Sequence, residues 1–403
     1  MMKKSVFAIV LAATLLLTGC WDSHELDELS IVVGVALDKG NGADMDGMDG
    51  RTYEEPDGQN SSKNVLLTVQ VANIQGESSG SSSNPGFFLL ENESGSLLSS
   101  LNFMNFESSR FLYMQHNPMI IISEELAREG IIEYVDYYMR DYFTRKEAWL
   151  FISKGKAKDM IGAQIPQSQI ASMGIVNMMA NDQGLFDVIG INLLEFTTDL
   201  METAKAPIIP VLELSEENEI NTIWMTGLGV FDEDVLIDVL DLDEIRGFVW
   251  TVNGIQTGII KADSDSGSAT LRVSGSKHEI KPVIREDGGV DFIADIFVRL
   301  SIGEVRGFES ISLEELHKTL EEMVREEVDQ LIQNTLKRVQ ELGADIYGFG
   351  SLVHKRYPSH WKDIKDNWKE MFTEVSISAN IEVDVASAGR LTQPLVTVKG
   401  EEK

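Results

Sequence analysis

The longest regular pattern in the sequence is an amphipathic stretch from Leu313 to Leu342. Ser312 precedes it and Glu315 follows three residues later, which is the capping-box pattern of a helix start, while Gly343 is a typical residue after a helix end. Apolar residues recur at spacings of mostly three and four, so one face of a helix roughly 45 Å long would be apolar. Such a face has to be buried, and we expect it to cover a sheet rather than to form a coiled coil.

Several shorter segments have the composition and spacing of strands and helices. Strand patterns lie at residues 29–37, 65–71, 119–122, 148–152, 223–231, 235–239 and 375–385, with further strands expected between 254 and 300. Helix patterns lie at residues 96–106, 124–139, 157–161 and 241–251. Pro207 and Pro210 bracket a segment that we interpret as an edge strand. We therefore predict a mixed α/β (α+β) fold of several sheet-and-helix subdomains, with a mostly antiparallel C-terminal sheet covered by the long helix.

A charged stretch at residues 215–219 divides the chain. The length of 403 residues suits two or three domains, at about 150 residues each. We predict a removed leader at residues 1–19, an N-terminal domain at 20–215 with room for two subdomains, and a C-terminal domain at 216–403.

The leader has the pattern of a secretory signal peptide. Lys3 and Lys4 precede an apolar run of 12 residues, Val6 to Leu17, which is interrupted only by Thr14. A helix of that length spans roughly 18 Å, which is too short for a hydrocarbon core of about 30 Å. The run therefore predicts export rather than a membrane span.

The apolar run ends in Leu17, Thr18, Gly19 and Cys20, a sequence that resembles the lipobox of bacterial lipoproteins. In those proteins the cysteine thiol receives a diacylglycerol, and the chain is cleaved directly before that cysteine. Cys20 is the only cysteine of the sequence, which excludes an intrachain disulfide. We interpret Cys20 as the lipidation site rather than as a buried thiol. Each buried CH₂ group of an acyl chain contributes about 0.8 kcal/mol to membrane binding. One acyl chain therefore anchors a protein only marginally, whereas the two chains of a diacylglycerol anchor it stably.

Acidic residues dominate the charge balance. Asp and Glu total 65 against 34 Lys and Arg, which gives a formal charge of −31. Nucleic-acid binding needs a basic surface, so we predict no nucleic-acid partner. The same charge opposes adhesion to anionic lipid by electrostatics alone. A contact with the membrane would therefore depend on the lipid at Cys20.

No motif assembles a catalytic or metal site, and we predict no enzyme activity, no metal and no cofactor. Residues 76–80 match G-x-S-x-G, but they lie in a Ser/Gly tract that cannot begin the helix of a nucleophile elbow. Two S-x-x-K matches, at residues 153–156 and 274–277, lack companion motifs. In the acidic loop at residues 40–62, an EF-hand register puts Met48 and Asp49 at the wrong positions. We interpret this loop as solvated, and calcium binding there stays open.

Four blocks of the sequence, taken in order, resemble the spore germination receptor C subunit family, the Ger(x)C lipoproteins. They lie at residues 19–38, 110–149, 227–250 and 345–368. The acidic loop and the Ser/Gly tract look like insertions relative to that family. Within the blocks, Trp21, Asp22, Tyr347 and Phe349 are candidate interface residues. Phe349 has the alternative interpretation of a core residue that follows a turn.

The resemblance implies a non-enzymatic subunit, lipid-anchored to the outer face of the cytoplasmic (inner spore) membrane. Such a subunit acts with integral-membrane A and B subunits in sensing small nutrients and triggering germination. The resemblance does not specify which nutrient is sensed, the stoichiometry of the subunits or the surface that docks the partner subunits. The alternative is a lipoprotein solute-binding protein of a transporter, which would need two lobes around a polar cleft. A membrane-tethered hydrolase is disfavoured by the motif search.

Overall fold

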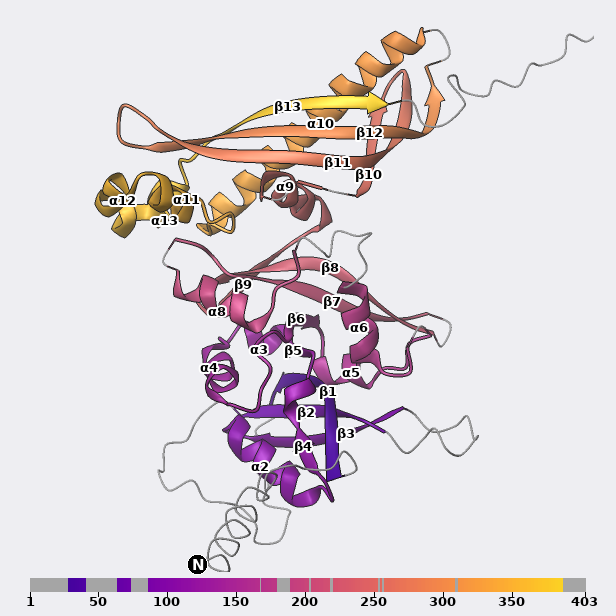
Figure 1. Ribbon diagram of the computed structural model, residues 1–403, viewed down its shortest axis with the longest axis vertical. Coiled ribbons are helices and arrows are strands. Elements are labelled where there is room, and N and C mark those ends of the chain that lie inside the picture. The colour runs from indigo at the N-terminus through magenta and orange to yellow at the C-terminus, as the bar shows by residue number, and fades with distance from the viewer. Residues whose placement is uncertain are drawn as a thin grey trace, which may run out of the picture.

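The computed structural model describes residues 28–40, 64–73, 86–166, 168–179, 189–202, 204–217, 220–252, 254–255, 257–308 and 311–386. Two β-sheets and their helices follow one another along the long axis of the molecule (Figure 1). The predicted leader, the lipobox with Cys20, the residues Trp21 and Asp22, residues 41–62 of the acidic loop and the G-x-S-x-G match lie outside the described residues.

The first sheet contains nine strands among the described residues, in the order β3-β2-β1-β5-β6-β7-β8-β9, with β4 paired to β1. Its strands are β1 (Leu29–Lys39), β2 (Val65–Ala72), β3 (Phe87–Ser94), β4 (Phe111–Tyr113), β5 (Met119–Ser123), β6 (Trp149–Lys154), β7 (Ile208–Glu217), β8 (Ile220–Asp232) and β9 (Val235–Leu240). The central strands β1, β5, β6 and β7 are parallel, whereas both flanks of the sheet are antiparallel. Every residue of β5 is buried, as expected for a central parallel strand covered on both faces.

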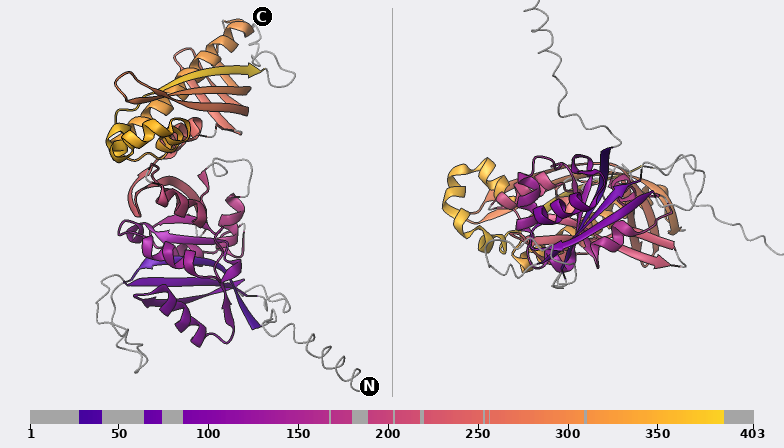
Figure 2. Two further views of the ribbon diagram at one scale, coloured as in Figure 1. Left: turned by 60° about the vertical axis from the view of Figure 1, so that its left-hand side comes forward. Right: turned by 90° about the horizontal axis from the view of Figure 1, so that it is seen from below.

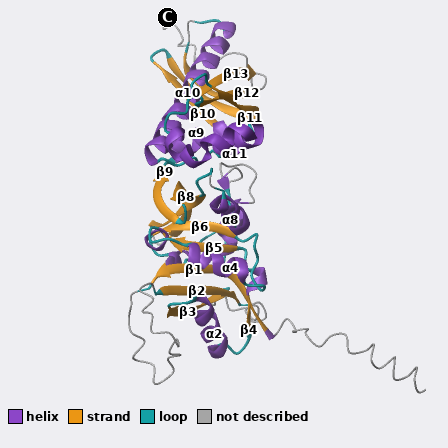
Figure 3. Ribbon diagram, turned by 90° about the vertical axis from the view of Figure 1, so that its left-hand side faces the viewer, coloured by secondary structure: helices purple, strands orange, loops and turns teal. Residues whose placement is uncertain are grey.

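Helices cover the faces of this sheet. They are α2 (Leu97–Glu107), α3 (Glu124–Ala127), α4 (Ile132–Arg140), α5 (Ala157–Gly162), α6 (Ala171–Met179) and α8 (Leu193–Met201), with the 3-10 turn η3 (Met114–His116). Helix α2 packs on β3 and β2 and lies at the end of the molecule that is farthest from the second sheet (Figures 1 and 3).

The second sheet has the order β10-β11-β12-β13. Its strands are β10 (Gly258–Ser264), β11 (Gly267–Ile284), β12 (Val290–Gly307) and β13 (Ile377–Ala386). The pairs β10–β11 and β11–β12 are antiparallel, while β12 and β13 are parallel. The helices of this region are α9 (Leu242–Val252), α10 (Leu313–Leu342), α11 (Phe349–Arg356), α12 (Pro358–Ile364) and α13 (Trp368–Phe372), with the 3-10 turn η4 (Lys365–Asn367).

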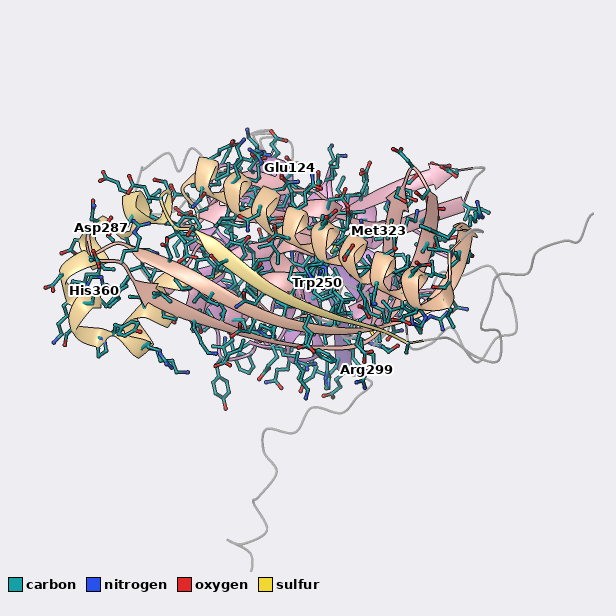
Figure 4. The ribbon with its side chains drawn as sticks, turned by 90° about the horizontal axis from the view of Figure 1, so that it is seen from above. Glu124, Trp250, Asp287, Arg299, Met323 and His360 are labelled. Atoms are coloured by element: carbon teal, nitrogen blue, oxygen red, sulfur yellow. The ribbon has the colours of Figure 1, made fainter. Side chains whose placement is uncertain are left out.

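Helix α10 lies across this sheet against β13 and β10 and also packs on α9 (Figure 2). Seen from above, α10, which carries Met323, runs close to β13 (Figure 4). Its first turn is a complete capping box, in which Ser312 Oγ accepts from Glu315 N at 3.2 Å and Glu315 Oε2 accepts from Ser312 N at 2.9 Å. Gly343 ends the helix with a φ of 64°, the left-handed conformation that glycine adopts without strain. The predicted helix and its bounds are confirmed.

The predicted fold class is also confirmed, namely a mixed α/β fold with a mostly antiparallel second sheet under a long amphipathic helix. Two local predictions are wrong. The helix expected at residues 124–139 is split into α3 and α4, because Gly130 between them has a φ of 102°, which a helix cannot contain. The expected edge strand is β7, which lies between β6 and β8 inside the sheet.

The predicted division between residues 215 and 216 falls near the end of β7, just before the turn to β8. Both β8 and β9 extend the first sheet, which therefore continues to Leu240. The division of the chain into separate domains at 20–215 and 216–403 stays a prediction.

Candidate functional site at the junction of the two sheets

We call β1 to β9 with their helices the first region, and α9 to β13 the second region. The two regions meet where the segment before β7 and the strand β8 face the helices of the second region. Ala206 N donates to the backbone oxygen of Asp345 at 2.9 Å. The ammonium group of Lys369 on α13 contacts both carboxylate oxygens of Asp232 at the end of β8, at 2.9 and 2.8 Å. Segments that are more than 130 residues apart in sequence are thereby held side by side.

The centre of this junction is the carboxylate of Asp345, a residue that is only 5% exposed. Its Oδ1 atom accepts from Phe349 N at 3.0 Å, and its Oδ2 atom accepts from Gly350 N at 2.9 Å and from Trp368 Nε1 at 3.0 Å. Phe349 and Gly350 begin α11, and the first N–H groups of a helix have no partner within the helix. Asp345 therefore caps α11 and ties it to α13.

Burial raises the pKa of Asp345 to about 6, because the charged form loses its hydration. The hydrogen bonds from the two backbone N–H groups and from the Trp368 indole oppose this shift, since they stabilise the carboxylate. The group is thus ionised at neutral pH and becomes protonated in mild acid.

Gly350 allows α11 to approach the first region closely. A Cβ atom at this position would lie 2.6 Å from the Cβ atom of Ala204, 2.7 Å from Trp368 Nε1 and 2.9 Å from Trp361 Cη2. Real Cβ atoms essentially never approach other heavy atoms to less than 3.0 Å, so glycine is required at this position for steric reasons.

Aromatic rings pack around the start of α11. The ring of Phe349 stacks on Phe292 of β12 with centroids 3.9 Å apart, and on Tyr347 at 4.7 Å. Phe349 is fully buried and Tyr347 is 7% exposed. Their burial corrects the prediction that these two side chains form a contact surface, because their rings are sequestered in the core of the second region. The alternative interpretation of Phe349 as a core residue is the one that the structure supports.

Ion pairs of Arg338 on α10 also stabilise the junction. The guanidinium of Arg338 contacts Asp238 of β9 and lies 3.4 Å from a carboxylate oxygen of Glu244 on α9. Neither the ion pairs of Arg338 nor the capping role of Asp345 was predicted from the sequence. An acidic residue shortly before a helix is a recognisable capping signal, but its partner Trp368 lies 23 residues away and could not be identified from spacing.

The first region contains a second buried capping carboxylate. Asp38, near the end of β1, accepts from Ala157 N at 2.8 Å and from Lys158 N at 2.9 Å, where α5 begins. Burial raises the pKa of Asp38, while these two hydrogen bonds oppose the shift. In both regions a buried carboxylate thus accepts hydrogen bonds from the first N–H groups of a helix. Both carboxylates therefore have a structural role.

The serines of the two S-x-x-K matches lie on strands. Ser153 belongs to β6 and is 1% exposed, and Ser274 belongs to β11. Within the described ranges, no three His, Cys, Asp or Glu side chains are grouped so that they could hold a metal ion. The described helices include none that is long and apolar enough to cross a membrane.

The fold and the junction define a two-sheet α/β protein whose halves are joined by the backbone hydrogen bond from Ala206 to Asp345 and by the ion pairs Lys369–Asp232 and Arg338–Asp238. Two family models match the chain in order: "Spore germination protein N-terminal domain" at residues 22–214 and "Spore germination B3/ GerAC like, C-terminal" at residues 226–389. The chain therefore belongs to the Ger(x)C family of spore germination proteins.

Individual relatives match over nearly their whole length. Spore germination protein KC of Bacillus subtilis (strain 168) is 25% identical over 420 residues, covering 98% of each chain. Spore germination protein B3 of the same organism is 23% identical over 398 residues, covering 96% of this chain and 99% of that protein. The crystal structure of the GerBC protein is similar in fold, with a TM-score of 0.56 and 19% identity over 80% of this chain and 94% of that one.

Proposed function

We propose that the chain is a lipid-anchored, non-enzymatic subunit of a nutrient germinant receptor. In this proposal it acts with two integral-membrane subunits, A and B, to trigger spore germination. The observation that carries the proposal is the match to both family domains, in order and across nearly the whole chain, together with relatives named as spore germination proteins.

The proposed anchor is a diacylglycerol on Cys20, at the end of the signal-like run. It would hold the body at the outer face of the cytoplasmic (inner spore) membrane, with Trp21 and Asp22 next to the headgroups. Confinement to that surface raises the effective concentration of the chain near its membrane partners, so that modest protein contacts are enough for assembly.

A non-enzymatic role is supported by what the buried acids do. Asp38 and Asp345 accept hydrogen bonds from helix N-termini, and Asp345 also binds an indole N–H group. A catalytic acid or base needs access to a substrate proton, whereas these carboxylates are occupied by backbone donors.

The proposal is tested by a Cys20→Ala substitution in spores that produce the full chain. We expect germination in response to the nutrient of this receptor to be abolished or strongly reduced, because the chain leaves the membrane. Ser23→Ala, a similarly small change three residues away, is the matched control and leaves germination unchanged. The response to a nutrient sensed by another receptor shows that the spores are otherwise intact.

An unchanged response of the Cys20→Ala spores, with the protein recovered in the soluble fraction, would contradict the proposal. A genomic observation adds a second test. We expect the genes of two receptor-type membrane proteins to adjoin the gene of this chain.

A further inference from the structure

The outer face of α2 has an unusual composition for this protein. Residues 94–106 contain no Asp, Glu, Lys or Arg, in a chain of which 25% is charged. Leu97, Leu101 and Met104 are buried against the sheet. Leu98 and Phe106 nevertheless point outward, with exposed fractions of 55% and 89%. A helix that is apolar on both faces is normally covered on both faces.

The outward residues of α2 form one continuous surface. Leu98, Asn102 and Phe106 are all exposed and follow one another at intervals of four, so they line one side of the helix. We call these three side chains the α2 face. Its composition of two apolar side chains and one amide suits the boundary between water and lipid.

The α2 face lies next to the point where the chain leaves toward Cys20. Leu29, the first residue of β1, pairs with Phe111 of β4. Asn105 near the end of α2 accepts from Leu112 N at 2.9 Å, which ties α2 to β4. Glu28 and Asn105 also line one shallow hollow together with Ser108, Ser109, Arg110 and Phe111.

The length of the connecting chain limits how far this end can lie from an anchored Cys20. Eight residues lie between Cys20 and Leu29, so the nine steps from one to the other reach at most roughly 30 Å when fully extended. The second sheet lies at the other end of the molecule (Figure 3). Of the two ends, the tether therefore keeps the one with α2 close to the bilayer.

We propose that the α2 face rests in the interfacial layer of the bilayer that carries the Cys20 anchor. This inference rests on the proposed function, since it needs the lipid at Cys20. Burial of Phe106 and Leu98 among the headgroups removes apolar surface from water, and the absence of charge on the face avoids a desolvation penalty. The contact would fix the orientation of the body on the membrane.

The test uses the full processed chain with its native lipid, reconstituted in vesicles of phosphatidylethanolamine and phosphatidylglycerol that contain a nitroxide-labelled lipid. An Asn102→Cys substitution places a fluorescent label on the α2 face. Asn334→Cys, on an exposed position of α10, is the matched control because it replaces the same residue type. With Cys20 lipidated, the added thiol is the single labelling site.

We expect the label at residue 102 to be quenched several-fold more than the label at residue 334. Adding Phe106→Asp should weaken docking about tenfold and bring quenching near the control value, since the burial of the Phe106 ring among the headgroups is lost. Met201→Asp is the control for this second change, because Met201 is 80% exposed and lies on α8.

Equal quenching at residues 102 and 334 in protein that floats with the vesicles would overturn the α2 proposal alone. Protein that does not float would contradict the anchor itself and, with it, both proposals. Quenching at residue 102 that requires added A and B subunits would identify a protein as the occupant of the α2 face and would overturn the bilayer proposal.

Discussion

Helices α2 and α10 each cover a β-sheet, but their outer faces differ. Both bury apolar residues against their sheets. The exposed side of α10 carries charged residues along its length, among them Glu322, Arg325 and Glu326, whereas the exposed side of α2 carries none before Glu107. The inner faces determine the fold of each region. The outer faces differ because, in our account, α10 faces water and α2 faces the bilayer.

The largest difference between the two helices should appear in stability measurements. Ile332 of α10 is fully buried, so Ile332→Ala should lower the free energy of unfolding by about 2–5 kcal/mol through lost burial and the cavity that remains. Leu98→Ala, at a position that is 55% exposed, should change it by less than about 0.5 kcal/mol. Urea unfolding of the processed chain measures both variants. Similar effects of the two substitutions would contradict the distinction.

The junction should respond to pH through Asp345. Its pKa of about 6 lies above the unfolded value of 3.8, so its contribution to stability is fully present below pH 3.8 and is lost as the pH rises toward 6. Two pKa units correspond to roughly 3 kcal/mol. Asp345→Asn removes this dependence and costs about 1–3 kcal/mol near pH 4, because an amide N–H then faces an N–H donor.

Unfolding curves of both proteins from pH 4 to pH 7 make this measurement. The stability advantage of wild type over Asp345→Asn should shrink as the pH rises through this range. Since both chains share every other titratable group, their difference isolates Asp345. An advantage that stays constant from pH 4 to pH 7 would show that the Asp345 carboxyl is not perturbed by burial.

The helix starts offer a smaller comparison. Ser312 caps α10 with a complete capping box, whereas Ser96 caps α2 through a single hydrogen bond of 3.5 Å to Ser99 N. Ser312→Ala should therefore cost about 1 kcal/mol, and Ser96→Ala less than that. The same urea titration compares them. A larger loss for Ser96→Ala would mean that the α2 start is the better ordered of the two.

The smallest effect is expected at the Lys369–Asp232 ion pair. Both side chains are at least half exposed, with fractions of 63% and 50%, so water and salt screen their attraction. Lys369→Gln should cost less than about 1 kcal/mol, and this difference should vanish in high salt. A larger, salt-insensitive loss would assign this pair a main part in joining the two regions.

Patterns within one element were readable from the sequence, and contacts between elements were not. Apolar spacing, Ser312 and Gly343 predicted α10 with its observed bounds. The position of β7 inside the sheet depends on strands that are distant in sequence, and Pro210 misleadingly suggested an edge. The role of Asp345 depends on Trp368 and on the approach of Gly350 to Ala204, which are tertiary contacts. The burial of Tyr347 and Phe349 could not be read from the local sequence.

The central claim is that the chain is held at a membrane through lipid on Cys20. Mass spectrometry of the N-terminal peptide of protein taken from spore membranes tests it most directly. We predict a chain that begins at Cys20 and carries a diacylglycerol on the Cys20 sulfur. A mature chain with an unmodified Cys20 thiol would contradict it.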